Sequence, residues 1–277
     1  MPKESESDRS PIDQISQDLR PEDRKGKGDF VASFYESPWL EQLVGKMHHP
    51  GEERLIEEIG RRCKIDNSSE ILDIGCGNGT TTIEISRSFG CAAVGLEISQ
   101  DLIQEAMEKA SSLDVENIDF QVTDGGIPAF PDGAFDFVLF ISSFSLFENK
   151  SEILREVRRI LRPGGTLVIT NMVISEDMNL DIPDKMMFAS CISGALPNGS
   201  ISDLIENVGF NEVISVDWTH ELRRQWATAF MRTRLKRKRG PFEDTNRAEG
   251  EEIREFLKMA EEIFESGYLG YYIFIGK

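Results

Sequence analysis

Apolar residues follow two alternating patterns through the middle of the chain. Short, nearly continuous apolar runs predict strands, and apolar positions at helical spacing between them predict helices. Such alternation is typical of an α/β fold with a parallel sheet. The run Phe135–Ile141 is apolar almost throughout, as in a central strand covered by helices on both faces. The predicted strands span 71–74, 91–97, 117–122, 135–141 and 166–173, and the predicted helices span 80–89, 100–111 and 150–161.

The pattern changes on the N-terminal side of this block. Residues 1–28 are rich in Ser, Asp, Glu, Lys and Arg, and we expect a disordered tail there because little apolar surface is available for burial. Residues 30–63 carry two segments with helical spacing, of which the second is expected at about 51–63. We therefore expect one domain over 29–277 that begins with an N-terminal helical cap at 30–63.

On the C-terminal side, a helix around 200–208 and a sixth strand over 213–219 are expected. A final strand is expected over 271–275. Between these two strands, residues 220–266 have helical pattern over 220–239 and 248–266. We interpret residues 220–266 as a helical insertion near the end of the domain.

A glycine-rich turn follows the first predicted strand and is the strongest chemical signal. Gly75, Gly77 and Gly79 stand at alternate positions before a threonine-rich helix start, and Asp73 precedes them. Glycines allow close backbone approach to a ligand, and the helix start offers unpaired N–H groups. The dinucleotide fingerprint is G-x-G-x-x-G, whereas this turn is G-x-G-x-G. A carboxylate at Asp73 disfavours a pyrophosphate and suits the ammonium and sulfonium of S-adenosylmethionine.

The turn resembles motif I of the class I S-adenosylmethionine-dependent methyltransferases. Phe130–Gly133 and Leu161–Gly165 are similar to segments of the ubiquinone-biosynthesis-like branch, and the resemblance covers about 55–218 and 268–277. It implies a Rossmann-like sheet of seven mostly parallel strands with helices on both faces. The last strand is then antiparallel and lies between the fifth and the sixth.

Five further positions are expected at the cofactor site. Glu97 ends the second strand, where a carboxylate can accept both ribose hydroxyls. Ile98 is then expected against the adenine. The resemblance implies that Asp124 contacts the adenine amino group and that the Gly125 backbone contacts the ring. Ser142 follows the fourth strand, at the sheet edge where open α/β sheets bind ligands.

Composition restricts the partners and the location. Lys and Arg total 31 against 49 Asp and Glu, a net charge of −18, which disfavours binding to nucleic acid phosphates. No apolar run approaches the length of a membrane span, and no apolar signal core stands at the N-terminus. Four scattered cysteines without a C-x-x-C pair indicate reduced thiols in a cytoplasm. No metal site is expected, since His48 and His49 lack further spaced ligands. The oligomeric state is not predicted.

The methyl acceptor is less constrained than the donor. The leading hypothesis is a small-molecule acceptor, since no Asn/Asp-Pro-Pro-aromatic segment of the amine-methylating type follows the fourth strand. Two residues are candidates for catalysis, Cys191 and His220. Cys191–Ala195 resembles the Cys-x-x-Gly-Ala segment of arsenite methyltransferases, whose further cysteines have no convincing counterparts here. Arsenite or metalloid methylation, a non-catalytic binding protein and a dinucleotide oxidoreductase remain as alternatives.

Overall fold

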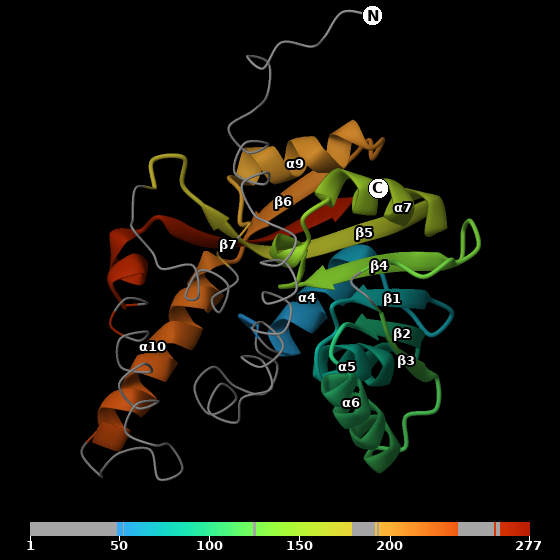
Figure 1. Ribbon diagram of the computed structural model, residues 1–277, viewed down its shortest axis with the longest axis horizontal. Coiled ribbons are helices and arrows are strands. Elements are labelled where there is room, and N and C mark those ends of the chain that lie inside the picture. Colours follow the sequence, from blue (N-terminus) through green and yellow to red (C-terminus); the bar gives the residue numbers. More distant parts are fainter. Residues whose placement is uncertain are drawn as a thin grey trace, which may run out of the picture.

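The structure is a computed structural model that describes residues 49–51, 53–123, 126–178, 192, 194–237, 258 and 261–277. Seven strands form one sheet (Figure 1). Their bounds are β1 Glu70–Ile74, β2 Ala92–Glu97, β3 Ile118–Val122, β4 Phe135–Ile141, β5 Leu161–Ile174, β6 Val213–Asp217 and β7 Leu269–Gly276.

The strand order is β3-β2-β1-β4-β5-β7-β6. The first five strands in this order pair in parallel, whereas β7 pairs antiparallel with both β5 and β6. In Figure 1, β4 and β5 point toward the side on which α10 (Thr219–Arg237) stands, and β7 points the opposite way. The predicted Rossmann-like sheet with an antiparallel last strand is therefore confirmed.

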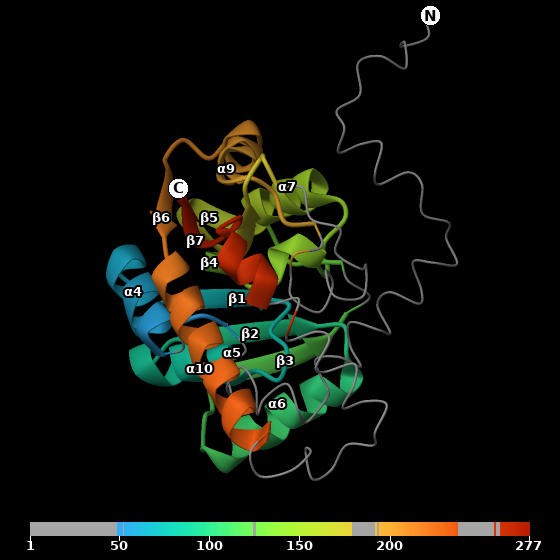
Figure 2. The ribbon, with the colours of Figure 1, turned by 90° about the vertical axis from the view of Figure 1, so that its left-hand side faces the viewer.

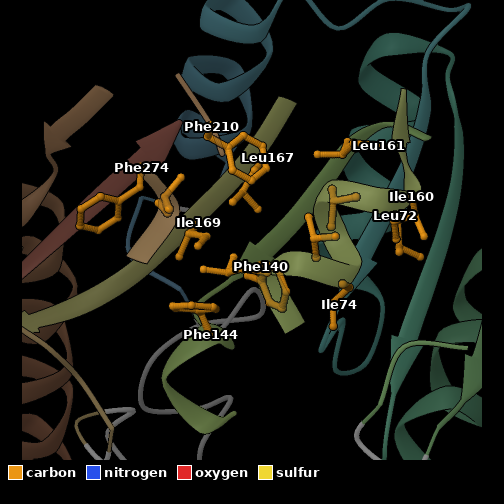
Figure 3. Close-up of a cluster of buried hydrophobic side chains, with 14 of the residues drawn as sticks. Leu72, Ile74, Phe140, Phe144, Ile160, Leu161, Leu167, Ile169, Phe210 and Phe274 are labelled. Atoms are coloured by element: carbon orange, nitrogen blue, oxygen red, sulfur yellow. The ribbon is translucent and has the colours of Figure 1, made fainter. Parts of the chain in front are cut away.

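Helices cover both faces of this sheet. Leu55 and Ile59 from α4 pack with Ile85 from α5 in the buried cluster on one face. Leu154 and Val157 from α7 belong to the cluster on the other face. That second cluster also holds Phe140, Phe144, Phe210 and Phe274 (Figure 3). The bounds are α4 Glu53–Cys63, α5 Thr80–Phe89, α6 Gln100–Ser112, η2 Phe144–Leu146, α7 Lys150–Ile160, α9 Asn198–Asn207 and α10 Thr219–Arg237.

The fifth strand differs from the prediction at its start. We expected Arg162–Gly165 to break the chain before a strand over 166–173, but β5 begins at Leu161. Leu161 pairs with Phe135, and the register shifts between Phe135 and Phe137. The glycines accommodate this irregularity, since Gly164 has φ +81°. A segment that is a breaker by composition is thus part of the sheet.

The insertion is described in part. Asp217 Oδ1 accepts a hydrogen bond from the Thr219 amide, and α10 begins at Thr219. The sixth strand therefore ends at Asp217, two residues earlier than expected. Residues 261–266 are helical, whereas 241–257 lie outside the described residues. Most of the predicted cap, 30–48, and the predicted tail lie outside them as well. No described helix combines the length and the apolar character that a membrane crossing requires.

Candidate functional site

The glycine turn lies between β1 and α5, and its three glycines have different surroundings. All three have positive φ, +76° at Gly75, +56° at Gly77 and +70° at Gly79. A Cβ at Gly75 would come within 2.5 Å of the Ser143 Cβ, and one at Gly79 within 2.6 Å of the Ala106 Cβ. A Cβ at Gly77 would meet nothing within 4 Å. Gly75 and Gly79 are thus required by packing, while Gly77 keeps an open backbone surface for a ligand.

Asp73 is a buried carboxylate on β1, two residues before the first glycine of this turn. Only 1% of the residue is exposed. Its Oδ2 accepts a hydrogen bond of 2.6 Å from the Thr82 hydroxyl, while Oδ1 is buried without a hydrogen-bond partner. Burial raises the pKa of the Asp73 carboxyl to about 6, the Thr82 hydrogen bond opposes this rise, and the Glu97 charge adds to it. Such an incompletely satisfied carboxylate is costly in the free protein and suits a cationic ligand.

Glu97 ends β2 and joins the glycine turn to the next helix. Its Oε2 accepts a hydrogen bond of 3.0 Å from the Gly77 amide. Its Oε1 accepts bonds from the amides of Ile98, at 2.9 Å, and Ser99, at 3.2 Å. Ser99 is also the N-cap of α6. Glu97, which is predicted to bind the ribose, therefore also holds the backbone of the site in place. The sequence did not indicate this second role.

The predicted adenine side of the site is partly described. Ile98 is 49% exposed, and Val122, which pairs with Glu97 at the end of β3, is 50% exposed. Two large apolar side chains therefore remain open to solvent at neighbouring strand ends. Asp124 and Gly125 lie outside the described residues, so their predicted contacts stay predictions.

Ser142 stands at the carboxyl end of β4 in a left-handed conformation, with φ +58°. Its amide donates to Thr170 O at 2.9 Å and to Thr170 Oγ1 at 3.1 Å. Its hydroxyl lies within hydrogen-bond distance of the Tyr271 hydroxyl on β7. The next residue, Ser143, donates its hydroxyl to Ile74 O and so fixes this turn against β1. Ser142, predicted at the carboxyl-terminal end of the strands, therefore lies next to the glycine turn.

The segment after Ser143 is fixed by a half-buried lysine. Lys150 Nζ donates to Phe147 O at 2.7 Å and to Ser145 O at 3.2 Å. Burial lowers the pKa of the Lys150 ammonium to about 8, and the charge of Glu148 acts in the opposite direction. A Cβ at Gly194 would lie 2.3 Å from Ser145 O. The Gly-Ala part of the segment that follows Cys191 thus packs on the turn after β4.

One of the two catalytic candidates, His220, is described, and it lies at the surface. Cys191 lies outside the described residues. His220 is at the surface of the first turn of α10, where 66% of its side chain is exposed. Its neighbour Glu221 is buried and accepts a hydrogen bond of 2.6 Å from Arg54. The inward-facing polar residue of this turn is therefore Glu221, which forms an ion pair with α4.

Another residue near the site was not singled out as a ligand by the sequence. His49 is 2% exposed, and its Nε2 lies 3.0 Å from Thr81 Oγ1 in the first turn of α5. This contact attaches the start of the described chain to the helix behind the glycine turn. In the part of the chain that is described, no group of three or more His, Cys, Asp and Glu residues is arranged to hold a metal ion.

Comparison with known proteins agrees with this geometry. Residues 65–230, more than half of the chain, match the family described as "Methyltransferase domain". The chain belongs to this family. The match confirms the predicted methyltransferase class, and S-adenosylmethionine is the methyl donor that the family uses.

Individual relatives are distant and overlap the chain to different extents. The O-methyltransferase resE of Aspergillus sclerotiorum is 27% identical over 71% of this chain and 74% of its own length. Methyltransferase GfsG of Streptomyces halstedii is 28% identical over 44% of each chain, so less than half of that relative is matched. A Haemonchus contortus phosphoethanolamine N-methyltransferase 2, solved with S-adenosyl-L-methionine, shares the fold with a TM-score of 0.78 and 16% identity, over 90% of this chain and 59% of that one.

Proposed function

We propose that this chain transfers the methyl group of S-adenosylmethionine to a hydroxyl oxygen of a small molecule. The observation that carries the donor part is Asp73 Oδ1, a buried carboxylate oxygen without a hydrogen-bond partner, four residues before the open backbone of Gly77. A ligand ammonium supplies the missing donors, and charge-assisted hydrogen bonds of this kind are among the strongest in proteins. The oxygen acceptor is supported by the similar resE protein, which is named an O-methyltransferase.

The donor supplies an activated methyl group on a sulfonium, and the residues of this chain hold and orient it. In this proposal Asp73 binds the amino group, Glu97 binds the ribose and Ile98 lies against the adenine. Gly75, Gly77 and Gly79 allow the backbone to approach the ligand closely. The main catalytic contribution of the chain is then to align the acceptor oxygen, the methyl carbon and the sulfur.

The acceptor is proposed to enter where the turn after β4 meets the insertion. Ser142 and Ser145 lie at the carboxyl ends of the strands, and Gly194 packs on Ser145. In Figures 1 and 2, α10 stands on the side toward which β4 and β5 point. We propose that the insertion over 220–266, with residues 30–50, covers the bound acceptor and excludes water.

Arsenite or metalloid methylation is not favoured by the described cysteines. A trivalent arsenic site needs several soft thiolates. Burial raises the pKa of the Cys63 and Cys91 thiols to about 11, and burial with the charges of Asp73 and Glu97 raises the pKa of Cys76 well above its usual value. Thiols held protonated in this way are poor ligands. Cytoplasmic location and the absence of nucleic acid substrates, both expected from composition, remain part of the proposal.

Two measurements test this function. Calorimetric titration with S-adenosylmethionine, S-adenosylhomocysteine and NAD is expected to show binding of the first two only. Release of S-adenosylhomocysteine is then measured with a panel of phenols and secondary alcohols and with arsenite. Methyl transfer to a hydroxyl compound is the expected result. Turnover of arsenite that is lost in Cys191→Ser contradicts the proposal, and so does tight NAD binding.

A further inference from the structure

Three hydroxyl groups, one directly after β4 and one each on β5 and β7, form a chain of hydrogen bonds at the proposed acceptor side. The Ser142 hydroxyl bonds to the Tyr271 hydroxyl, and Tyr271 donates to Thr170 Oγ1 at 2.8 Å. Thr170 is fully buried and 1% of Tyr271 is exposed, whereas Ser142 is half-buried. The chain therefore begins at a partly accessible hydroxyl and continues into the protein interior.

The donor and acceptor roles in these hydrogen bonds follow from the single proton on each hydroxyl. A tyrosine hydroxyl has one proton, and the Tyr271 proton points to Thr170 Oγ1. Tyr271 therefore accepts from Ser142, which means that the single Ser142 proton points to Tyr271. The remaining hydrogen-bonding capacity of Ser142 Oγ consists of its lone pairs. Ser142 is thus presented as a hydrogen-bond acceptor.

The backbone keeps Ser142 in this position. Both bonds from its amide end on Thr170, the residue that also receives the Tyr271 proton. Its left-handed φ of +58° is uncommon for serine and persists only where surrounding contacts enforce it. The following Ser143 lies against Gly75 and bonds to Ile74 O. These contacts hold the Ser142 hydroxyl beside the glycine turn that is proposed to bind the methyl donor.

We infer that Ser142 Oγ accepts a hydrogen bond from the hydroxyl group that is to be methylated, and that Tyr271 is the positioning residue that makes Ser142 an acceptor. The inference rests on the proposed function and adds a specificity to it. A compound with an O–H group can donate a hydrogen bond to Ser142 Oγ. Its methyl ether has only lone pairs at that oxygen and cannot donate one. The same contact discriminates between the substrate and the methylated product.

The test compares 4-fluorophenol with 4-fluoroanisole, read by fluorine NMR at millimolar concentration in the presence of S-adenosylhomocysteine. One neutral hydrogen bond is worth about 1 kcal/mol, so the wild type is expected to bind the phenol about fivefold more tightly than the ether. In Tyr271→Phe the Ser142 hydroxyl proton loses its acceptor and is free to point elsewhere. The ratio of phenol affinity to ether affinity is therefore expected to fall. In Ser142→Gly, which tolerates the positive φ, it is expected to fall to about one.

Two controls separate positioning from a general loss of structure. Tyr272→Phe changes the next residue of β7, whose side chain belongs to the opposite face, and is expected to keep the wild-type ratio. Tyr271→Phe in the Ser142→Gly background is expected to have no further effect on the ratio, because its influence passes through Ser142. Thermal denaturation of each variant checks that it is folded.

A wild-type ratio of one, or tighter binding of the ether, overturns the inference. It is also overturned if Tyr271→Phe leaves the ratio at its wild-type value. Failure of the proposed function is a different result, since it consists of no methyl transfer to any hydroxyl compound in the panel.

Discussion

Arg54 Nη2 and Glu221 Oε2 lie 2.6 Å apart and connect α4 to α10 across 167 residues of sequence. In both ribbon views the first turns of α10 lie beside α4 (Figures 1 and 2). Glu221 is the buried member of the pair, with 8% of its side chain exposed against 41% for Arg54. The pair therefore connects the described part of the N-terminal cap to the start of the insertion.

The unequal burial of this pair predicts unequal effects of mutation. Arg54→Met leaves a buried carboxylate with Arg224 and His220 as its remaining neighbours, at 3.4 and 3.5 Å, and is expected to cost roughly 1–2 kcal/mol of unfolding free energy. Glu221→Gln removes the buried charge and is expected to cost less. Urea denaturation of the two single variants and the double variant measures the coupling. Equal costs for the two single variants contradict this prediction.

Asp73→Asn is expected to stabilise the free protein at pH 7 while weakening cofactor binding. The folded pKa of about 6 lies above the ordinary aspartate value of 3.8, so the folded state holds more protons between these values and stability falls as pH rises through them. Replacing the carboxylate is expected to recover on the order of 2 kcal/mol. Thermal denaturation and calorimetry with S-adenosylhomocysteine measure the two effects. Thr82→Val, which removes the hydrogen bond to Asp73, is expected to raise the pKa further.

The affinity of the wild type for S-adenosylmethionine is expected to decrease as the pH falls through about 6. Protonation of Asp73 removes the charge that is proposed to bind the ligand ammonium. Calorimetry between pH 5 and 8 measures this dependence, and the Asp73→Asn variant is expected to lose it. A pH dependence that persists in the variant assigns the effect to another group.

Glu97→Ala is expected to weaken S-adenosylhomocysteine binding about 10- to 100-fold, because hydrogen bonds to charged groups contribute roughly 1.5–3 kcal/mol. Since Glu97 accepts the amides of Gly77, Ile98 and Ser99, the variant is also expected to lose on the order of 1–3 kcal/mol of stability. Glu84→Ala, at a surface position of α5, serves as the control. Unchanged affinity in calorimetry removes Glu97 from the site.

Gly194→Ala is expected to impair turnover of the acceptor and to leave cofactor affinity within a few-fold. The new Cβ would lie 2.3 Å from Ser145 O, and the φ of +71° is unfavourable for alanine. Gly199→Ala is the matched control, because a Cβ there meets nothing within 4 Å. The two variants are compared by S-adenosylhomocysteine release under saturating cofactor. Equal activity of both variants contradicts a role for Gly194 in shaping the acceptor side.

The lowered pKa of Lys150 predicts that the free energy of unfolding changes at alkaline pH. Its folded pKa of about 8 lies below the ordinary lysine value of 10.5, so the unfolded state holds more protons between these values and stability from this residue rises with pH. Lys150→Met is expected to lack this rise. The difference in urea midpoint between the two proteins, measured at pH 7, 8.5 and 10, tests it. A constant difference across this range excludes Lys150 as the source.

The sequence predicted the parts of the fold that depend on local pattern. The parallel strands and crossover helices follow from apolar spacing, and their observed bounds differ by a few residues. The start of β5 was not predictable in this way, because Leu161 joins the sheet through its pairing with Phe135. The glycines beside it have the composition of a turn whether or not a neighbouring strand is present.

The site was predictable where a motif marks it and not where distant residues meet. Asp73 and Glu97 stand at strand ends that the pattern located. The bond between Ser142 and Tyr271 spans 129 residues and carries no local signal. The sequence singled out His220 as a candidate, and only the packing of α10 against α4 shows that its neighbour Glu221 is the one that faces inward.

The place of β7 in the sheet has a consequence for folding. Val168 on β5 pairs with Ile275 on β7 about a hundred residues later, and β7 also pairs with β6. Contacts this distant in sequence form slowly, because a long loop must close before they contribute. Until β7 inserts, β5 and β6 each have an edge of unpaired backbone, and such edges are templates for pairing with another chain. The same insertion that places Tyr271 beside Ser142 thus makes this chain susceptible, while it folds, to exchanging its last strand with a second copy.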